Sequence, residues 1–517
     1  MTSPPPREMI SAHGESIDRG GAADDAQRAG GTVRRILRRR DAIGIIVGIV
    51  IGAGIYRAPP TVAGTTGDVG WLLVAWLLGG LISFAGALCY AELATKYPHA
   101  GGDYHFLTRA FGRRTSFLYA WARATVINPG AIALLAFVFG DYMASAIPAG
   151  PGTASWAIAI VVLLTVVNVV GLRASARTQN LLTLLEVFGL VAVAFAGFML
   201  PGPAAASAAI PMFSSTPSLG PFGLAMVFVL LTYGGWNEGA YISAELEGGR
   251  RAIVTSLLAS IAIVTVVYVV VNAALVHGLG LKGLEASKTP AADIVAAALG
   301  PVAAKALAVL VAIAALTSIN ATMIVGARSN YALGGDWTSL RWMFRWDAAR
   351  GVPLAGHLVQ SAIALALVIF GTYQHDGFEA MVEFTAPVYW AFLFLVGIAL
   401  FVLRSHDRDR DRDRREPHVP SPHVPSPPVA SSRVAAPRAT SPPVTSPRDD
   451  APFRVPLYPL TPIVFCAACG YLFYSSVSYA ASRGAVHVSL IAMAIGFIAL
   501  VAIEAHRRLA PNQPDQL

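Results

Sequence analysis

The sequence predicts an all-α integral membrane protein with twelve transmembrane helices. Of its 517 residues, 55% are hydrophobic and only 13% are charged, a composition too apolar for a soluble protein of this length. The apolar residues are gathered into runs of about 20 residues, the length that an α-helix needs to cross a bilayer. Basic residues cluster at the ends of alternate runs, as they do in membrane proteins of fixed orientation.

Most connections between the runs are short, so the sequence predicts one helical bundle without a separate soluble domain. The predicted spans are residues 41–63, 71–93, 116–142, 154–171, 181–200, 222–246, 253–276, 302–326, 356–372, 380–403, 458–477 and 485–505. The expected parts are a disordered cytoplasmic N-terminus (1–37), a ten-helix core (38–403), a disordered Pro/Arg-rich cytoplasmic loop (404–452), helices eleven and twelve (453–506) and a cytoplasmic tail (507–517).

The distribution of charge predicts the orientation. A net charge of +8 can indicate a nucleic-acid partner, but here Arg and Lys lie at the ends of the predicted spans, which does not favour one. Basic residues precede the first span and follow the second, fourth, sixth, eighth and twelfth, whereas the segments 143–153 and 201–221 contain none. By the positive-inside rule, both termini lie in the cytoplasm and the protein crosses a plasma or inner membrane.

Two of the predicted spans contain glycines that favour a break in the helix. Gly52-Ala53-Gly54 lies within the first span and Gly234-Gly235 within the sixth. Glycine is a poor helix former, and irregular backbone inside a membrane is tolerated only where it lines a protein cavity. Matching breaks in spans one and six are typical of transporters built as two inverted repeats of five helices. The sequence therefore predicts a 5+5 inverted repeat, with spans eleven and twelve outside it.

A broken span exposes backbone groups that can bind a ligand. The N–H groups at the start of a half-helix favour a carboxylate, and free carbonyls at the other broken end favour an ammonium group. Together they suit a zwitterionic amino acid, whatever its side chain. The alternative is that the glycines serve only close helix packing, which Gly44 and Gly48 fit better than the paired breaks do.

Five short motifs carry a family resemblance. They are Gly52-Ala53-Gly54-Ile55-Tyr56, Ala91-Glu92-Leu93, Tyr233-Gly234-Gly235-Trp236-Asn237, Ser318-Ile319-Asn320 and Pro452-Phe453-Arg454-Val455-Pro456. Jointly they resemble the amino acid–polyamine–organocation transporter superfamily, close to its L-type amino acid transporter branch. The resemblance covers residues 38–403 and 451–505.

The resemblance implies a secondary active transporter of amino acids or related amines that works by alternating access, either proton-coupled or exchanging. It also implies that the substrate lies between the broken spans, with Asn237 close to it. The candidate substrate-binding residues are Gly52, Ala53, Gly54, Ile55, Leu231, Thr232, Tyr233, Gly234, Gly235, Trp236, Asn237 and Glu238.

Two glutamates depart from the family pattern. Their roles decide the open questions of coupling and substrate charge. Glu186, in the fifth span, falls where many sodium-independent relatives carry a lysine. Because an unpaired charge inside a membrane is costly, we hypothesise that Glu186 carries the coupling proton; a structural hydrogen bond or a cation ligand are the alternatives. Glu238 could bind the amino group of a cationic substrate or close the broken sixth helix. Candidates for the same ion or substrate site in span eight are Thr317, Ser318 and Asn320.

Other functions remain as alternatives to amino acid transport. A transporter of polyamines or other cationic amines is one, and a transceptor that senses amino acids without moving them is another. The sequence shows no metal-ligand cluster, nucleophile triad or phosphate loop, so it predicts neither an enzyme nor a cofactor. Animal members of the family bind a heavy chain through a cysteine between spans three and four. Residues 143–153 contain no cysteine, so no disulfide-linked heavy chain is expected.

Overall fold

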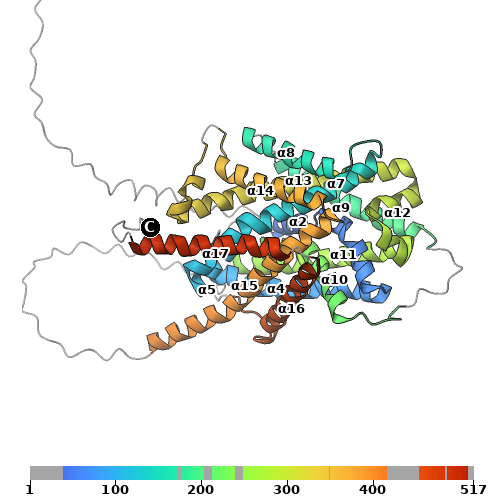
Figure 1. Ribbon diagram of the computed structural model, residues 1–517. Helices are drawn as coiled ribbons and strands as arrows, with labels where there is room; N and C mark the ends of the chain where they lie inside the picture. Colours follow the sequence, from blue (N-terminus) through green and yellow to red (C-terminus); the bar gives the residue numbers. More distant parts are fainter. Residues whose placement is uncertain are drawn as a thin grey trace, which may run out of the picture.

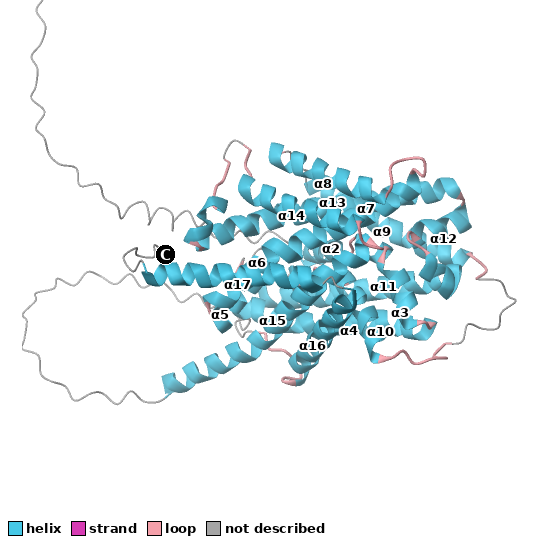
Figure 2. Cartoon of the chain, in the orientation of Figure 1, coloured by secondary structure: helices cyan, strands magenta, loops and turns pink. Residues whose placement is uncertain are grey.

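The computed structural model describes residues 39–99, 101–171, 176–202, 212–238, 249–347, 350–415, 453–483 and 486–509. Within these ranges the chain is helical, apart from connections and one isolated bridge between Asp347 and Val352 (Figures 1 and 2). The helices are α2 (Arg39–Val50), η1 (Ala53–Tyr56), α3 (Ala58–Thr66), α4 (Val69–Lys96), α5 (Gly102–Phe111), α6 (Arg113–Ala122), η2 (Arg123–Ile127), α7 (Asn128–Ala146), α8 (Thr153–Val170), α9 (Ala176–Met199), α10 (Leu219–Thr232), α11 (Gly249–Ala286), α12 (Pro290–Leu299), α13 (Pro301–Asp336), η4 (Thr338–Met343), α14 (Leu354–Thr372), α15 (Gly377–Arg415), α16 (Leu460–Arg483) and α17 (Val486–Leu509).

Nine helices in the described part of the chain are long and apolar enough to cross a membrane. They are α4, the continuous helix from α6 to α7, α8, α11, α13, α14, α15, α16 and α17, which match predicted spans two to four and seven to twelve. The remaining predicted spans are 41–63, which is interrupted, 181–200, which coincides with most of α9, and 222–246, of which residues 239–246 lie outside the described ranges.

The first predicted span is divided at its glycines. Helix α2 ends at Val50, Gly52 is extended with φ −110° and ψ −177°, and the short 3-10 helix η1 follows. Helix α3 then begins at Ala58, with Pro59 in its first turn. Proline suits this position because the first N–H groups of a helix have no intrahelical acceptor to lose. The interruption is therefore encoded by local residue preferences on both sides.

The sixth predicted span is also interrupted. Helix α10 ends at Thr232, and residues 233–238 form a turn in which Gly235 has φ 101°. That left-handed conformation is open to glycine and strained for most other residues. Because residues 239–248 lie outside the described ranges, the predicted second half of this span stays a prediction.

The third predicted span is one long helix with a π-helical turn, η2, between α6 and α7. Pro129 lies two residues after this turn and lacks the N–H that an uninterrupted ladder would use. Helices α7 and α13 pack against each other in the middle of the bundle, and α15 packs on α7 from another side (Figure 1). Helices α7 and α13 contact η1, α15 contacts α10, and α11 packs along α2 and α3.

One boundary differs from the prediction. Residues 404–415, expected in a disordered loop, continue α15 as far as Arg415. The start of this extension is held by contacts that the sequence does not show: Arg404 bonds Glu92, and Asp407 pairs with Lys96. The predictions for residues 1–37, 416–452 and 510–517 concern positions outside the described ranges.

Candidate functional site

A cavity of about 1150 Å³ lies where the two interrupted spans meet. Its lining combines backbone from both breaks with side chains of α7, α13 and α15. From the breaks it includes Gly52, Ala53, Gly54, Leu231, Thr232, Gly234, Gly235, Asn237 and Glu238. From there the cavity follows α2 to Arg40, which is exposed at the start of that helix. The breaks thus sit at the inner end of a space that opens at one end of the bundle.

The two interrupted spans lie in contact, and at Gly235 the contact requires glycine. A Cβ atom on Gly54 would lie 3.6 Å from the side chain of Thr232, at the end of α10. A Cβ atom on Gly235 would lie 2.9 Å from Cγ2 of Ile49 and 3.1 Å from the carbonyl oxygen of Ile49, in α2. The second contact is closer than a real side chain tolerates. A residue larger than glycine at position 235 would push the two broken spans apart.

The breaks offer both donors and acceptors to a ligand. The N–H groups of Ala53 and Gly54, at the start of η1, have no intrahelical acceptor because they begin a helix. The hydroxyl of Tyr268, in α11, lies 2.9 Å from the carbonyl oxygen of Val50 and 3.3 Å from that of Thr232. The carbonyl of Leu231 accepts the N–H of Gly234 at 3.0 Å. Each carbonyl oxygen has two lone pairs, so these acceptors can still receive a bond from a ligand.

Glu186 reaches the same cavity from α9. Its residue is only 5% exposed, and its carboxylate accepts the hydroxyl of Thr317 at 3.1 Å. Its main-chain carbonyl accepts the hydroxyl of Tyr56, at the end of η1, at 3.0 Å. None of the ion pairs found among the described residues includes Glu186. The carboxylate therefore joins α9 to α13 without a cationic partner in the described ranges.

Glu238 also lines the cavity and is paired. Its carboxylate accepts Arg123 of η2 at 3.3 Å, and its N–H bonds the carbonyl of Gly235 at 3.0 Å. Arg123 also donates to the hydroxyl of Tyr119, which donates to Asp103 at 3.0 Å. The main-chain bond closes a turn of the broken sixth span, while the carboxylate is held by the third span.

A sequence model of the amino acid permease family matches residues 37–500. The chain belongs to the amino acid permease family. It is 27% identical over 366 residues to b(0,+)-type amino acid transporter 1 of Mus musculus, which covers 70% of this chain and 74% of that transporter. It is 31% identical over 331 residues to large neutral amino acids transporter small subunit 2 of Homo sapiens, covering 60% and 61%.

These matches confirm the resemblance that the motifs suggested. Together with its apolar helices, they make the permease a multi-pass membrane protein of the amino acid–polyamine–organocation superfamily that resembles the L-type branch. These two similar proteins are named as transporters, which fits a function other than catalysis. Among the residues that the structure describes, no group of three or more His, Cys, Asp and Glu is placed to hold a metal ion.

The permease brings most of the predicted site residues to the cavity but not all of them. Thr317 and Ser318 line it together with Glu186. The predicted residues that are not part of its lining are Ile55, Tyr233, Trp236 and Asn320. The hydroxyl of Tyr233 donates to the carbonyl of Trp76, and the ring of Trp236 packs on Tyr90 and Phe465. Asn320 accepts the amide of Asn168, in α8, at 2.8 Å.

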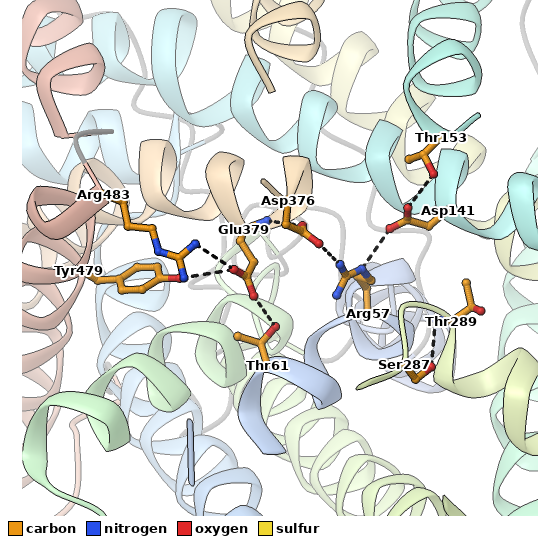
Figure 3. Close-up of polar contacts among 10 residues, drawn as sticks. All are labelled: Arg57, Thr61, Asp141, Thr153, Ser287, Thr289, Asp376, Glu379, Tyr479 and Arg483. Carbon is orange, nitrogen blue, oxygen red and sulfur yellow. Dashed lines mark hydrogen bonds and ion pairs between the residues drawn. The ribbon is translucent and has the colours of Figure 1, made fainter. Parts of the chain in front are cut away.

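Sequence reasoning did not single out the acids around Arg57. In the permease Arg57 is 3% exposed and pairs with Asp141, at the end of α7, and with Asp376, directly before α15 (Figure 3). A signal was present, because Arg57 and Asp141 both fall inside predicted spans, where opposite charges are expected to find each other. Asp376 carried no such signal, since it lies in the connection before span ten.

Proposed function

We propose that this permease moves amino acids across the membrane by alternating access, within twelve spans whose first ten form a 5+5 inverted repeat. The observation that supports this most directly is the meeting of two interrupted spans at one cavity. Membership of the amino acid permease family supports it independently. The similar proteins are named as transporters of large neutral amino acids and as a b(0,+)-type amino acid transporter.

Recognition would rest on the backbone of the two breaks. The substrate carboxylate would accept the N–H groups of Ala53 and Gly54, which begin η1. The substrate ammonium group would donate to carbonyls at the end of α10, near Leu231 and Thr232. Most of the remaining lining is apolar, including Phe228, which leaves room for varied substrate side chains.

The charges in the cavity favour a zwitterionic amino acid with a neutral side chain over a polyamine. Glu238 was the candidate to bind a second ammonium group, but its carboxylate already faces Arg123. A cationic substrate would have to displace that guanidinium or occupy Glu186, the carboxylate that we assign to the coupling proton. A transceptor would bind the same molecules, so only a measurement of movement separates it from a transporter.

The cavity's shape corresponds to one of the two states that alternating access requires. It reaches the surface near Arg40, whereas Arg57 and its partners lie across the other end. With both termini in the cytoplasm, as the charge distribution predicts, this is an inward-facing state. The opposite state would open the end at Arg57 and close the end at Arg40.

Glu186 is the candidate for coupling to protons. It is buried at the junction of η1, α9 and α13, where its two hydrogen bonds come from Tyr56 and Thr317. A carboxylate there can take up or release a proton as the cavity opens and closes to water. A purely structural link between α9 and α13 and a cation site remain the alternatives to this role.

The test is uptake by purified permease in proteoliposomes. We expect labelled neutral amino acids such as leucine or alanine to accumulate, with competition by other neutral amino acids and little by putrescine. Counterflow into vesicles preloaded with unlabelled substrate would show exchange, and an imposed pH gradient would show proton coupling. Thermal stabilisation by amino acids without uptake or counterflow would contradict transport and favour a transceptor. Faster uptake of putrescine than of leucine would contradict the proposed substrate class.

A further inference from the structure

The closed end of the cavity is built around Arg57, the residue between η1 and α3. Its guanidinium bonds Asp141 of α7 at 3.1 Å and also pairs with Asp376 (Figure 3). Both acids are fixed by second bonds. Asp141 accepts the hydroxyl of Thr153 at 3.0 Å, and Asp376 accepts the N–H of Glu379 at 3.0 Å, as an N-cap of α15 does. The second half of the first span is thus tied to α7 and to the start of α15 through one side chain.

Arg57 also forms the boundary of the cavity. Its guanidinium carbon lies 5.1 Å from the ring centre of Phe378, which lines the cavity. The ring of Phe378 lies 6.0 Å from that of Phe228, another lining residue. A substrate that moves from the breaks toward this end therefore meets two aromatic rings first and the Arg57 ion pairs next. In the state that opens near Arg40, the substrate does not have to pass these rings and ion pairs.

A second layer of contacts lies beyond Arg57 (Figure 3). The carboxylate of Glu379, in α15, accepts the hydroxyl of Thr61 in α3 at 3.1 Å and pairs with Arg483 of α16 at 3.5 Å. Arg483 also lies 3.7 Å from Glu383. This layer again joins α3 to the helix that carries Asp376. Both layers would have to part for α3 to move away from α15.

We propose that Arg57, Asp141 and Asp376 form a latch that closes this end of the transport pathway, and that Arg57 leaves both acids when the pathway opens there. The inference rests on the proposed alternating access. An ion pair suits a reversible closure because burying it costs nearly as much as its attraction returns. When water enters, the separated charges regain hydration, which offsets much of the attraction lost as the latch opens.

The latch is connected to the proposed proton site by a short series of hydrogen bonds. Tyr142, next to Asp141, donates its hydroxyl to the carbonyl of Tyr56 at 2.8 Å. The hydroxyl of Tyr56 donates in turn to the carbonyl of Glu186 at 3.0 Å. Because Tyr56 directly precedes Arg57, a shift of η1 that follows protonation of Glu186 would move the latch as well.

The test measures access to the cavity from the closed side. Val382 lines the cavity below the latch, so Val382→Cys is introduced into a variant without Cys89, Cys466 and Cys469. A membrane-impermeant thiol reagent is then added from each side of the membrane separately. We expect slow labelling from the closed side and a rate at least about tenfold higher after Asp376→Asn, because loss of one partner shifts the population toward the open latch. Asp141→Asn should act in the same direction.

A matched control lies on the same helix. Asp407→Asn removes the partner of Lys96 at the other end of α15 and should leave labelling from the closed side unchanged. Arg57→Lys keeps the charge but loses the two-pronged guanidinium, and should give an intermediate rate. If Asp376→Asn disturbs folding, Arg57→Lys carries the test alone.

The latch would be wrong if Arg57→Lys and every folded acid variant were labelled at the parent rate. Equal acceleration by Asp407→Asn would also contradict it, since that result would point to general loosening of the helix. The labelling requires no substrate. A permease that fails to move any amino acid therefore disproves the proposed function while the latch can still be measured.

Discussion

The charged side chains at the two ends of the cavity differ in how deeply they are buried. At the closed end, the side chains of Arg57, Asp141 and Asp376 are 4%, 10% and 15% exposed. At the open end, the side chains of Arg123 and Glu238 are 15% and 40% exposed. A buried pair depends on geometry and on the exclusion of water, whereas a hydrated pair is screened and contributes at most about 1 kcal/mol. The comparison shows the closed end held by more deeply buried ion pairs and the open end by a pair whose Glu238 carboxylate is partly hydrated.

Both pairs are built on the same long helix. Arg123 and Asp141 are separated by 18 positions of the third predicted span, or about 27 Å along a helix. Arg57 and Glu238 each lie three residues after the last glycine of a break, Gly54 and Gly235. The two interrupted spans thus present opposite charges to the two ends of one helix. A movement that exchanges the open and closed ends would strengthen one pair as it releases the other.

The largest expected effect comes from the contact between the breaks, on which both ends depend. We predict that Gly235→Val lowers uptake at least about 100-fold. Gly235 has φ 101°, which is strained for a β-branched residue by about 1–3 kcal/mol, and the new Cβ would press on the backbone of Ile49 at 3.1 Å. Uptake per mole of purified, monodisperse permease is the measurement.

Gly152→Val is the matched control for this substitution. Gly152 has φ −65° and ψ 172°, which valine adopts readily, and a Cβ atom there meets nothing within 4 Å. We expect its uptake to equal that of the parent. Near-parent uptake by Gly235→Val would show that the two breaks need no close contact, and the shared cavity would then lose its proposed role.

A second, smaller effect is expected at Glu186, which joins α9 to α13. We predict that Glu186→Gln keeps part of the uptake but loses its dependence on pH. In the parent, acidifying the outside should raise proton-coupled uptake, because protons then drive substrate inward. Glutamine keeps an oxygen that accepts from Thr317 but cannot take up a proton. Initial rates across a series of outside pH values provide the measurement.

Glu504→Gln provides the comparison for Glu186→Gln. Glu504 pairs with Arg114 near the end of α17, away from the cavity, and its side chain is 28% exposed. Its pH profile should match that of the parent. A Glu186→Gln profile identical to the parent profile would leave Glu186 as a structural link between α9 and α13.

The sequence predicted the breaks because their cause is local. The low helix propensity of glycine and the proline at the start of α3 act within a few positions of Gly52 and Gly54. The cavity wall contributed by Glu186, Thr317 and Ser318 was also anticipated, through the family resemblance. Local preferences and family motifs were thus enough to predict the interrupted spans and one side of the site.

The ion pairs could not be predicted in the same way. Arg57 and Asp376 are separated by 319 positions, and Arg123 and Glu238 by 115. Pairing over such distances depends on how helices pack, which apolar spans of similar composition do not specify. For the same reason the sequence predicted Trp236 and Asn320 in the site, although both side chains turn toward neighbouring helices.

The smallest expected effect is at the open end, and it tests the contrast between the two ion pairs directly. We predict that Glu238→Gln changes uptake less than about fivefold, since a partly hydrated pair contributes at most about 1 kcal/mol. The ratio of neutral to cationic amino acid uptake should stay the same, because Arg123 already neutralises the Glu238 carboxylate. Competition of labelled leucine by alanine and by arginine measures that ratio.

Arg123→Gln is the complementary variant, because it removes the cationic partner of Glu238. It leaves the Glu238 carboxylate without its guanidinium partner, so this variant should gain competition by arginine while Glu238→Gln does not. A ratio that shifts about tenfold in Glu238→Gln itself would mean that the carboxylate contacts the substrate in the parent. The open end would then select substrate charge, and its weak ion pair would be a binding group that Arg123 holds between transport cycles.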